Sequence, residues 1–225
     1  MKTAATAIAV GMVAIGCATS TASTGTEVTA ISETGTTKLP EPQRSGGPSL
    51  FAMLQQRGSA PQATFPSGKL SYNDMSTVLW AASGKNRDGV KWTVPMAMGK
   101  PPYCKVYIAT DEGAFLYNWD THSLVTVTRD NIKPDIATQE FGQKAPATMV
   151  FVTDGEELAK YSNQAWAEEF GIMLVGAMSQ DVYLASEALG IGARLIYMVD
   201  REKTASHLKI GPKDKVVCAM VLGKR

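Results

Sequence analysis

Two polar residues at the end of a short predicted helix could bind a phosphate group. Ser49 can cap a helix whose apolar residues share one face, and this helix would end near Arg57, just before Ser59. An arginine fork can hold a phosphate through two N–H donors, and a serine hydroxyl adds another. An arginine near the C-terminal end of an exposed helix is also common. Taken alone, the Arg-x-Ser spacing favours that ordinary helix end over a phosphate site.

Other catalytic and metal-binding patterns are missing from the sequence. The two histidines, His122 and His207, have no Gly-x-Ser-x-Gly partner, which disfavours a hydrolase. There is no CxxC, HExxH or acidic calcium loop, so we expect no metal site. Gly190 and Gly192 follow a predicted helix rather than a strand, which excludes a dinucleotide-binding fingerprint. By themselves these two glycines indicate only the end of a helix.

The N-terminus has the composition of an export signal. Lys2 supplies a positive charge, residues 4–16 are apolar or glycine except for Thr6, and small polar residues follow. The run is shorter than the roughly 20 apolar residues of a transmembrane helix. A buried N-terminal helix is the alternative, but the Thr- and Ser-rich sequence beside it offers no partner. We therefore expect residues 1–17 to be a signal peptide and the protein to be exported.

Cys17 is a candidate lipidation site. The residues before it resemble a bacterial lipobox, although Ala14 stands where a large aliphatic residue is usual. In a lipoprotein this cysteine would be acylated, and each buried methylene would add about 0.8 kcal/mol to membrane anchoring. Ordinary cleavage near Ala18 or Ala22 is the competing possibility. We expect either a membrane-anchored lipoprotein, which is slightly favoured, or a periplasmic protein.

The remaining chain divides into two parts by composition. Residues 18–47 contain few large apolar residues and predict a disordered tether, whereas residues 48–225 are long enough for one domain with a hydrophobic core. Removing Lys2 with the signal leaves 21 Lys+Arg against 21 Asp+Glu, and there is no basic run. We therefore expect no binding to nucleic acid. Cys104 and Cys218 lie in apolar predicted strands, which favours buried cysteines over a disulfide.

The apolar pattern of residues 48–225 predicts an α+β fold. Ser71 and Asp74 resemble a capping box at the start of a second helix that Gly84 ends. Three alternating runs (KVYIAT, AFLYNW and LVTVT) predict an antiparallel meander. A helix over about 131–141, a strand TMVFVT, and then a strand ARLIYMV, a helix over 201–208 and a strand VVCAMVL complete the pattern. Residues 164–189 form the longest periodic segment, which is apolar on nearly every face and must be central or lie in a subunit interface.

Four stretches, in this order, resemble the nitroreductase family, and within it the branch of thiazoline- and oxazoline-forming peptide dehydrogenases. They are LFAMLQQRGS, LSYNDMSTVLWAASGKNRDGVKWTVP, GAFLYNWDTHSL and AEEFGIMLVGAMSQDVYLASEALGIGA. The third carries a Gly-x-x-Tyr-x-x-x-x-His-x-Leu hairpin, and the fourth resembles the long core helix of the family dimer. The resemblance spans about residues 48–225. It implies a nitroreductase-like fold, with a central, mostly antiparallel sheet flanked by helices and a long buried core helix.

The resemblance also implies an FMN site. Its expected cofactor-binding residues are Arg57, Ser59, Ala97, Gly99, Lys100, Gly190, Gly192 and Arg225. The chain departs from the family at three positions: Pro61 replaces a second phosphate-binding cation, and Met96 and Gly99 replace a serine and an asparagine. A charged hydrogen bond contributes about 1.5–3 kcal/mol and a neutral one about 1 kcal/mol. Losing one of the first kind and two of the second would weaken FMN binding by roughly three orders of magnitude.

The functional expectation is an FMN-dependent oxidoreductase that transfers two electrons through flavin N5. Its catalytic residues and electron donor are not indicated, and its substrate would be a small molecule or a peptide. The alternative is a flavin-free binding or structural protein of the cell envelope that keeps the fold, which the three departures favour. The apolar core helix and the family both imply a homodimer.

Overall fold

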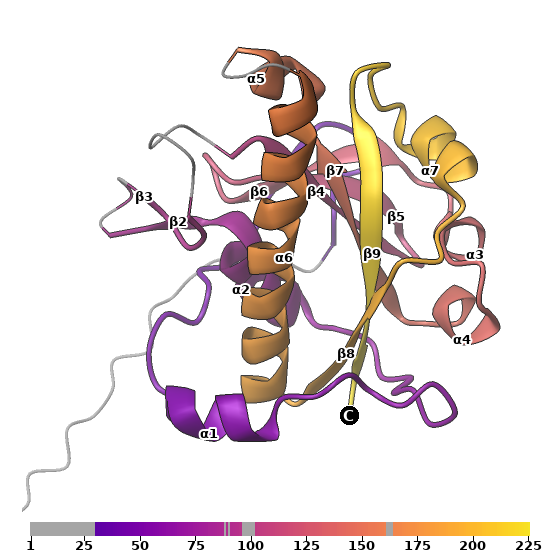
Figure 1. Ribbon diagram of the computed structural model, residues 1–225. Coiled ribbons are helices and arrows are strands. Elements are labelled where there is room, and N and C mark those ends of the chain that lie inside the picture. The colour runs from indigo at the N-terminus through magenta and orange to yellow at the C-terminus, as the bar shows by residue number, and fades with distance from the viewer. Residues whose placement is uncertain (1–29, 88, 90, 96–101, 161–163) are drawn as a thin grey trace, which may run out of the picture.

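The structure is a computed structural model that describes residues 30–225 except residues 88, 90, 96–101 and 161–163 (Figure 1). The strands are β1 (Thr36–Lys38), β2 (Lys85–Asn86), β3 (Lys91–Trp92), β4 (Cys104–Thr110), β5 (Gly113–Asn118), β6 (Ser123–Thr128), β7 (Ala147–Thr153), β8 (Ile191–Ile196) and β9 (Lys215–Lys224). The helices are α1 (Leu50–Gln56), α2 (Tyr72–Ser83), α3 (Lys133–Ile136), α4 (Glu140–Gln143), α5 (Gly155–Ala159), α6 (Gln164–Ala188) and α7 (Arg201–Leu208).

The centre of the fold is a seven-stranded sheet in the order β1-β6-β5-β4-β7-β9-β8, in which each neighbouring pair is antiparallel. Residues of α2 and α6 pack on one face, and residues of α3 and α7 pack on the other. The fold is therefore α+β with a helix-flanked antiparallel sheet, as the sequence predicted. Within the described residues, no helix combines the length and hydrophobicity that crossing a bilayer needs.

Local sequence signals set most element boundaries. The side chain of Ser71 accepts from the Asp74 amide, and the Asp74 carboxylate accepts from the Ser71 amide, so the predicted capping box starts α2. Gly84 ends this helix. Cys104 and Cys218 are buried and free, as expected. The helix predicted over 131–141 is instead two short helices, because Ala137 between them is extended and bridges to Val199.

Helix α6 provides the largest helical contribution to the core. Leu174, Val175, Met178 and Val182 are buried against the sheet and α2. Its opposite side is open: Ile172 and Met173 are 60% and 69% exposed. The sequence predicted a helix with apolar residues on nearly every side. In the single chain, only the side of α6 that faces the sheet and α2 is covered, and apolar residues on the opposite side are exposed. Figure 1 shows α6 lying along the front of the sheet, with α1 near its C-terminal end.

The predicted tether is wrong for residues 31–40. Ile31 and Leu39 are buried in the main core at 4% and 3% exposure, and β1 pairs with β6 at the edge of the sheet. Backbone pairing stabilises this segment regardless of side-chain type, so a Thr-rich composition does not prevent it. Two well-placed apolar side chains then anchor it. The part of the proposed tether before residue 30, the signal peptide and Cys17 lie outside the described residues.

A buried histidine attaches this N-terminal segment to the domain. His122 Nδ1 lies 2.8 Å from the Tyr117 hydroxyl, and its Nε2 lies 3.0 Å from the Pro40 carbonyl and 2.8 Å from Ser76 Oγ. Ser76 also donates to the Pro40 carbonyl at 2.5 Å. These partners fit a neutral imidazole that accepts from Tyr117 and donates to Pro40. The histidine of the hairpin motif therefore has a structural role.

The His122 contacts predict a pH-dependent stability. Burial lowers the pKa of His122 below its ordinary value of 6.5, with Arg44 and Lys38 acting in the same direction and Glu41 and the Pro40 carbonyl opposing them. In the window below 6.5 the unfolded chain therefore binds more protons than the folded one, and stability falls as the pH falls. Burial raises the pKa of Asp181 to about 6. Below that pH the folded chain binds the extra proton, so the contribution of Asp181 to stability increases as the pH falls.

Comparing wild type with His122→Asn isolates the histidine, because asparagine tolerates the positive φ of 49° at this position. We expect the free energy of unfolding in urea to fall more steeply for wild type than for the variant between about pH 8 and about pH 5. Equal slopes for the two proteins would show that His122 is not buried as a neutral group.

Candidate functional site

The Arg-x-Ser pair lies beside the C-terminal half of α6. The Arg57 guanidinium stacks over the Tyr183 ring, with its carbon 4.8 Å from the ring centroid. Ser59 Oγ lies 2.8 Å from the Tyr183 hydroxyl, which also accepts the Leu195 amide at 2.8 Å. When Tyr183 donates its proton to Ser59, the Ser59 proton is free for an anion. The structure thus brings together Arg57 and Ser59 on one tyrosine that the sequence did not single out.

The free edge of β8 positions the next residues. The Ala60 amide donates to the Ala193 carbonyl at 2.9 Å, so the backbone following Ser59 joins the outer edge of this strand. Arg194 Nη1 donates to the Ala60 carbonyl at 3.1 Å, and its guanidinium carbon lies 5.8 Å from the Phe141 ring centroid. Residues Arg57 to Ala60 are therefore fixed by side chains from both α6 and β8.

Two arginines near this segment form no ion pair within the described chain. Neither Arg57 nor Arg194 has a carboxylate partner among the described residues, and both side chains are partly accessible. An arginine without an anionic partner is well suited to bind an anionic ligand. Ser59 and Pro61 beside them are exposed. The arrangement can therefore accept a phosphate group from solvent without breaking an ion pair.

The two cations at the C-terminus, unlike Arg57 and Arg194, are paired with carboxylates. Arg225 forms two 2.8 Å hydrogen bonds with the Glu187 carboxylate, which lower the pKa of Glu187 and raise that of Arg225. Lys224 Nζ donates to Asp74 at 2.7 Å and to the Leu189 carbonyl at 2.8 Å. Burial alone would raise the pKa of Asp74, but its bonds with Lys224 and Ser71 hold it below the ordinary value. Both cations are neutralised within the protein, so Arg225 would have to exchange partners to bind a phosphate.

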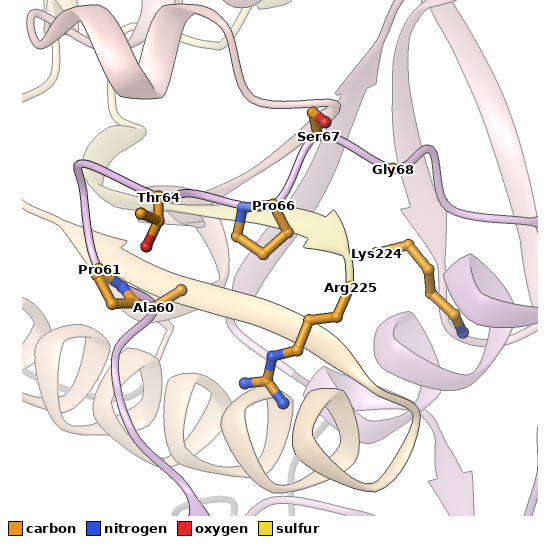
Figure 2. A pocket seen from close by; sticks show the side chains of 8 residues that line it. All are labelled: Ala60, Pro61, Thr64, Pro66, Ser67, Gly68, Lys224 and Arg225. Carbon is orange, nitrogen blue, oxygen red and sulfur yellow. The ribbon is translucent and has the colours of Figure 1, made fainter.

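A cavity of about 600 Å³ lies where the 60–68 segment crosses the end of β9. Figure 2 shows Lys224 and Arg225 leaving this strand end in different directions, with Pro66 lying close above β8 and β9. The lining residues are Ala60, Pro61, Thr64, Pro66, Ser67, Gly68, Lys224 and Arg225. Ala60 and Arg225 line the same cavity, although the Arg225 guanidinium points to Glu187 on α6.

The two predicted glycines have packing roles. Gly190 ends α6 with a φ of 68°, a conformation that favours glycine, and its carbonyl accepts the Arg225 amide at 3.0 Å. Gly192 lies within β8, and a Cβ there would stand 2.6 Å from Pro66 Cγ and 3.2 Å from Ala60 Cβ. Close approach of the 60–68 segment therefore explains Gly192 without a ligand. A flavin contact at either glycine stays a prediction.

The other predicted residues lie elsewhere. Ala97, Gly99 and Lys100 fall outside the described residues, as does Met96. Sequence reasoning missed Tyr183 and Arg194, because an isolated tyrosine in a helix and an isolated arginine in a strand carry no spacing signal. Within the described chain, no cluster of His, Cys, Asp and Glu could hold a metal ion.

Large apolar side chains are exposed on three elements of the fold. They occur on α1, on the open side of α6, and at and just after the end of β8. The residues are Leu50, Phe51, Leu54, Ile172, Met173, Leu195, Tyr197 and Met198, which we call the apolar face. Phe51 is 81% exposed. The predicted apolar side of α1 therefore points to solvent in the single chain, rather than into its core. Exposed apolar residues that gather in one contiguous patch mark an interaction site.

Comparison with known proteins agrees with this architecture. The sequence matches the model of the nitroreductase family over residues 64–224. A curated protein from Methanocaldococcus jannaschii, also named as a nitroreductase, is 27% identical over 136 residues, which are 56% of this chain and 68% of that protein. A crystal structure described as a nitroreductase from Ralstonia eutropha superposes with a TM-score of 0.78 at 26% identity, covering 87% of this chain and 91% of that one.

A more distant structure shares the fold alone. The Escherichia coli microcin synthetase McbBCD complex, with truncated pro-MccB17 bound, matches with a TM-score of 0.65 at 16% identity. The match covers 82% of this chain and 76% of the matched chain. The nitroreductase-like fold expected from the four sequence stretches is therefore confirmed.

Proposed function

Because the chain belongs to the nitroreductase family, a family of oxidoreductases, we propose that it is an FMN-dependent oxidoreductase. The observation that carries the proposal is the pairing of Arg57, which has no carboxylate partner in the described chain, with the Ser59 hydroxyl on Tyr183. These groups fit the phosphate of FMN in charge and in donor type. Members of this family typically bind FMN.

Each group would have a defined task. Arg57 would hold phosphate oxygens through its planar fork, and Ser59 would donate the proton that Tyr183 leaves free. When bound, FMN supplies two-electron transfer through its N5 atom. The protein would supply orientation, and the Tyr183 ring under Arg57 would restrict the guanidinium before the ligand arrives. Such preorganisation reduces the entropic cost of binding.

The affinity should be modest. Met96 and Gly99 stand where the resemblance implies a serine and an asparagine, and Arg225 is held by Glu187. We therefore expect the purified protein to carry less than one FMN per chain and to bind added FMN with a Kd on the order of micromolar. Titration of the protein into FMN, followed by flavin fluorescence, measures this affinity. Absence of any binding at far higher protein concentrations would favour the second candidate.

That second candidate is a flavin-free protein of the same fold that acts in binding or structure at the cell envelope. The ion pairs of Arg225 with Glu187 and of Lys224 with Asp74 favour it, because they leave the chain stable without an anionic ligand. It predicts a colourless protein whose thermal stability is unchanged by FMN. An FMN enzyme would instead be stabilised by FMN, and its stability would keep rising with the logarithm of the FMN concentration above the Kd.

We also propose a homodimer that buries the apolar face. Nitroreductase-fold proteins are commonly homodimers. The apolar face lies on the elements that hold Arg57 and Tyr183, so a second copy seated there would enclose the flavin-binding surface. Enclosure excludes water from a bound cofactor and strengthens its polar contacts. The substrate is proposed only as a small molecule or a peptide.

Export of the protein, with Cys17 as its lipid anchor, is likewise proposed from the N-terminal sequence. Replacing Cys17 by alanine in cells should move the protein from the membrane fraction to the soluble fraction or block its processing. If wild type and variant fractionate identically and both are processed at the same site, ordinary cleavage near Ala18 or Ala22 is correct.

A further inference from the structure

Arg194 is a cation that neither the sequence motifs nor the family resemblance assigns. It lies on β8, and its only hydrogen bond within the described chain is to the Ala60 carbonyl at 3.1 Å. No carboxylate in that part of the chain pairs with it. The remaining N–H donors of its guanidinium are therefore available, and the side chain is partly accessible.

The position of this guanidinium is informative. Ala60 lies between Ser59, a proposed hydrogen-bond donor to the phosphate, and Pro61, the position at which the family resemblance implies a second cation. The Ala60 amide is fixed to Ala193 at the edge of β8, and the Ala60 carbonyl accepts from Arg194, so this guanidinium is held against the residue that precedes Pro61. The Phe141 ring, 5.8 Å from the guanidinium carbon, further restricts the side chain.

We propose that Arg194 supplies the second cation for the phosphate of FMN, in place of the one missing at Pro61. The proposal rests on the proposed FMN function. Arg57 would contact the phosphate from the α6 side of residues 57–60, and Arg194 would contact it from the β8 side. A phosphomonoester carries close to two negative charges at neutral pH, so two arginines would balance it.

The proposal explains why Arg225 can remain paired with Glu187. A phosphate held by Arg57 and Arg194 requires no exchange of that bidentate ion pair. It also predicts that the protein distinguishes FMN from riboflavin, which has the same ring system but no phosphate. Loss of Arg194 should affect only the first ligand.

The test compares FMN and riboflavin affinities of the full domain by fluorescence titration. Arg194→Gln should weaken FMN binding by about tenfold to a hundredfold and leave riboflavin binding unchanged. Lys213→Gln is the matched control, because it removes the same charge from an exposed side chain that forms no ion pair within the described chain. Its FMN affinity should stay within about twofold of wild type.

Three results would overturn the inference, each in a distinct way. Unchanged FMN affinity in Arg194→Gln would show that Arg194 does not contact the phosphate. An equal loss for FMN and riboflavin would show that Arg194 only positions the 60–68 segment. If wild type binds neither ligand, the proposed FMN function itself fails, and the inference fails with it.

Discussion

Replacing Arg57 by alanine is expected to weaken FMN binding by about a hundredfold, which corresponds to about 3 kcal/mol. The variant loses the charged fork and also exposes the Tyr183 ring on which the guanidinium rests. Thermal stability should change little, since Arg57 forms no ion pair within the described chain and its contact with Tyr183 is partly exposed. Fluorescence titration with FMN measures the effect, and thermal unfolding of the ligand-free protein checks the fold.

Arg44→Ala is the matched control for this variant. Arg44 also lies over an aromatic ring, 5.8 Å from the Trp80 centroid, and its pairing with Glu41 at 3.6 Å is exposed. It should bind FMN as wild type does. If Arg57→Ala retains wild-type FMN affinity while folded, the assignment of the phosphate site to this segment is wrong.

Placing a charge on the apolar face is expected to separate the homodimer. Met173→Asp introduces a carboxylate on the open side of α6, where it is solvated in the single chain but buried without a partner in the dimer. The dimer dissociation constant should rise by about a hundredfold or more, whereas the monomer should keep its stability. Sedimentation velocity over a concentration series measures the association.

An aspartate introduced elsewhere supplies the control. Lys144→Asp changes an exposed residue just after α4, and it should leave the dimer intact. The Met173→Asp monomer should also bind FMN more weakly, because the second copy no longer encloses the cofactor. Wild-type protein that stays monomeric at high micromolar concentration would contradict the dimer and the enclosed site together.

Much of the fold could be predicted because strong local signals agree with the tertiary arrangement. The capping box of Ser71 and Asp74 starts α2, and the predicted helix over 201–208 has the same bounds as α7. Strand alternation likewise gave the β4–β5–β6 meander. The residues that determine these elements are close together in the sequence, so one sequence is enough to predict them.

The N-terminal strand could not be predicted for the opposite reason. β1 is held by backbone pairing with β6, by two isolated apolar residues, Ile31 and Leu39, and by the His122 contact with Pro40. Each of these interactions joins residues far apart in the chain. The composition of the segment, rich in threonine and glycine, correctly indicated a low apolar content but not the long-range partners.

The candidate site was predicted in part for similar reasons. Arg57 and Ser59 were identified from a motif, and the structure places them on the same tyrosine. The pairing of Arg225 with Glu187 and the contact of Arg194 with Ala60 depend on tertiary placement, which no spacing pattern reveals. The sequence therefore predicted Arg57 and Arg225 alike, whereas in the described chain Arg225 is paired with a carboxylate and Arg57 is not.

The most direct test of the central claim is anaerobic reduction of the FMN-loaded wild-type protein. FMN is mixed with an excess of protein at concentrations well above the expected Kd, so that nearly all the flavin is bound, and it is then reduced with one equivalent of dithionite and mixed with a quinone or nitroaromatic acceptor while the flavin spectrum is recorded. We predict that the bound flavin is reduced by two electrons and is reoxidised by the acceptor with the flavin still bound. A flavin that stays free at these protein concentrations, or a bound flavin that the acceptor cannot reoxidise, would contradict an FMN-dependent oxidoreductase.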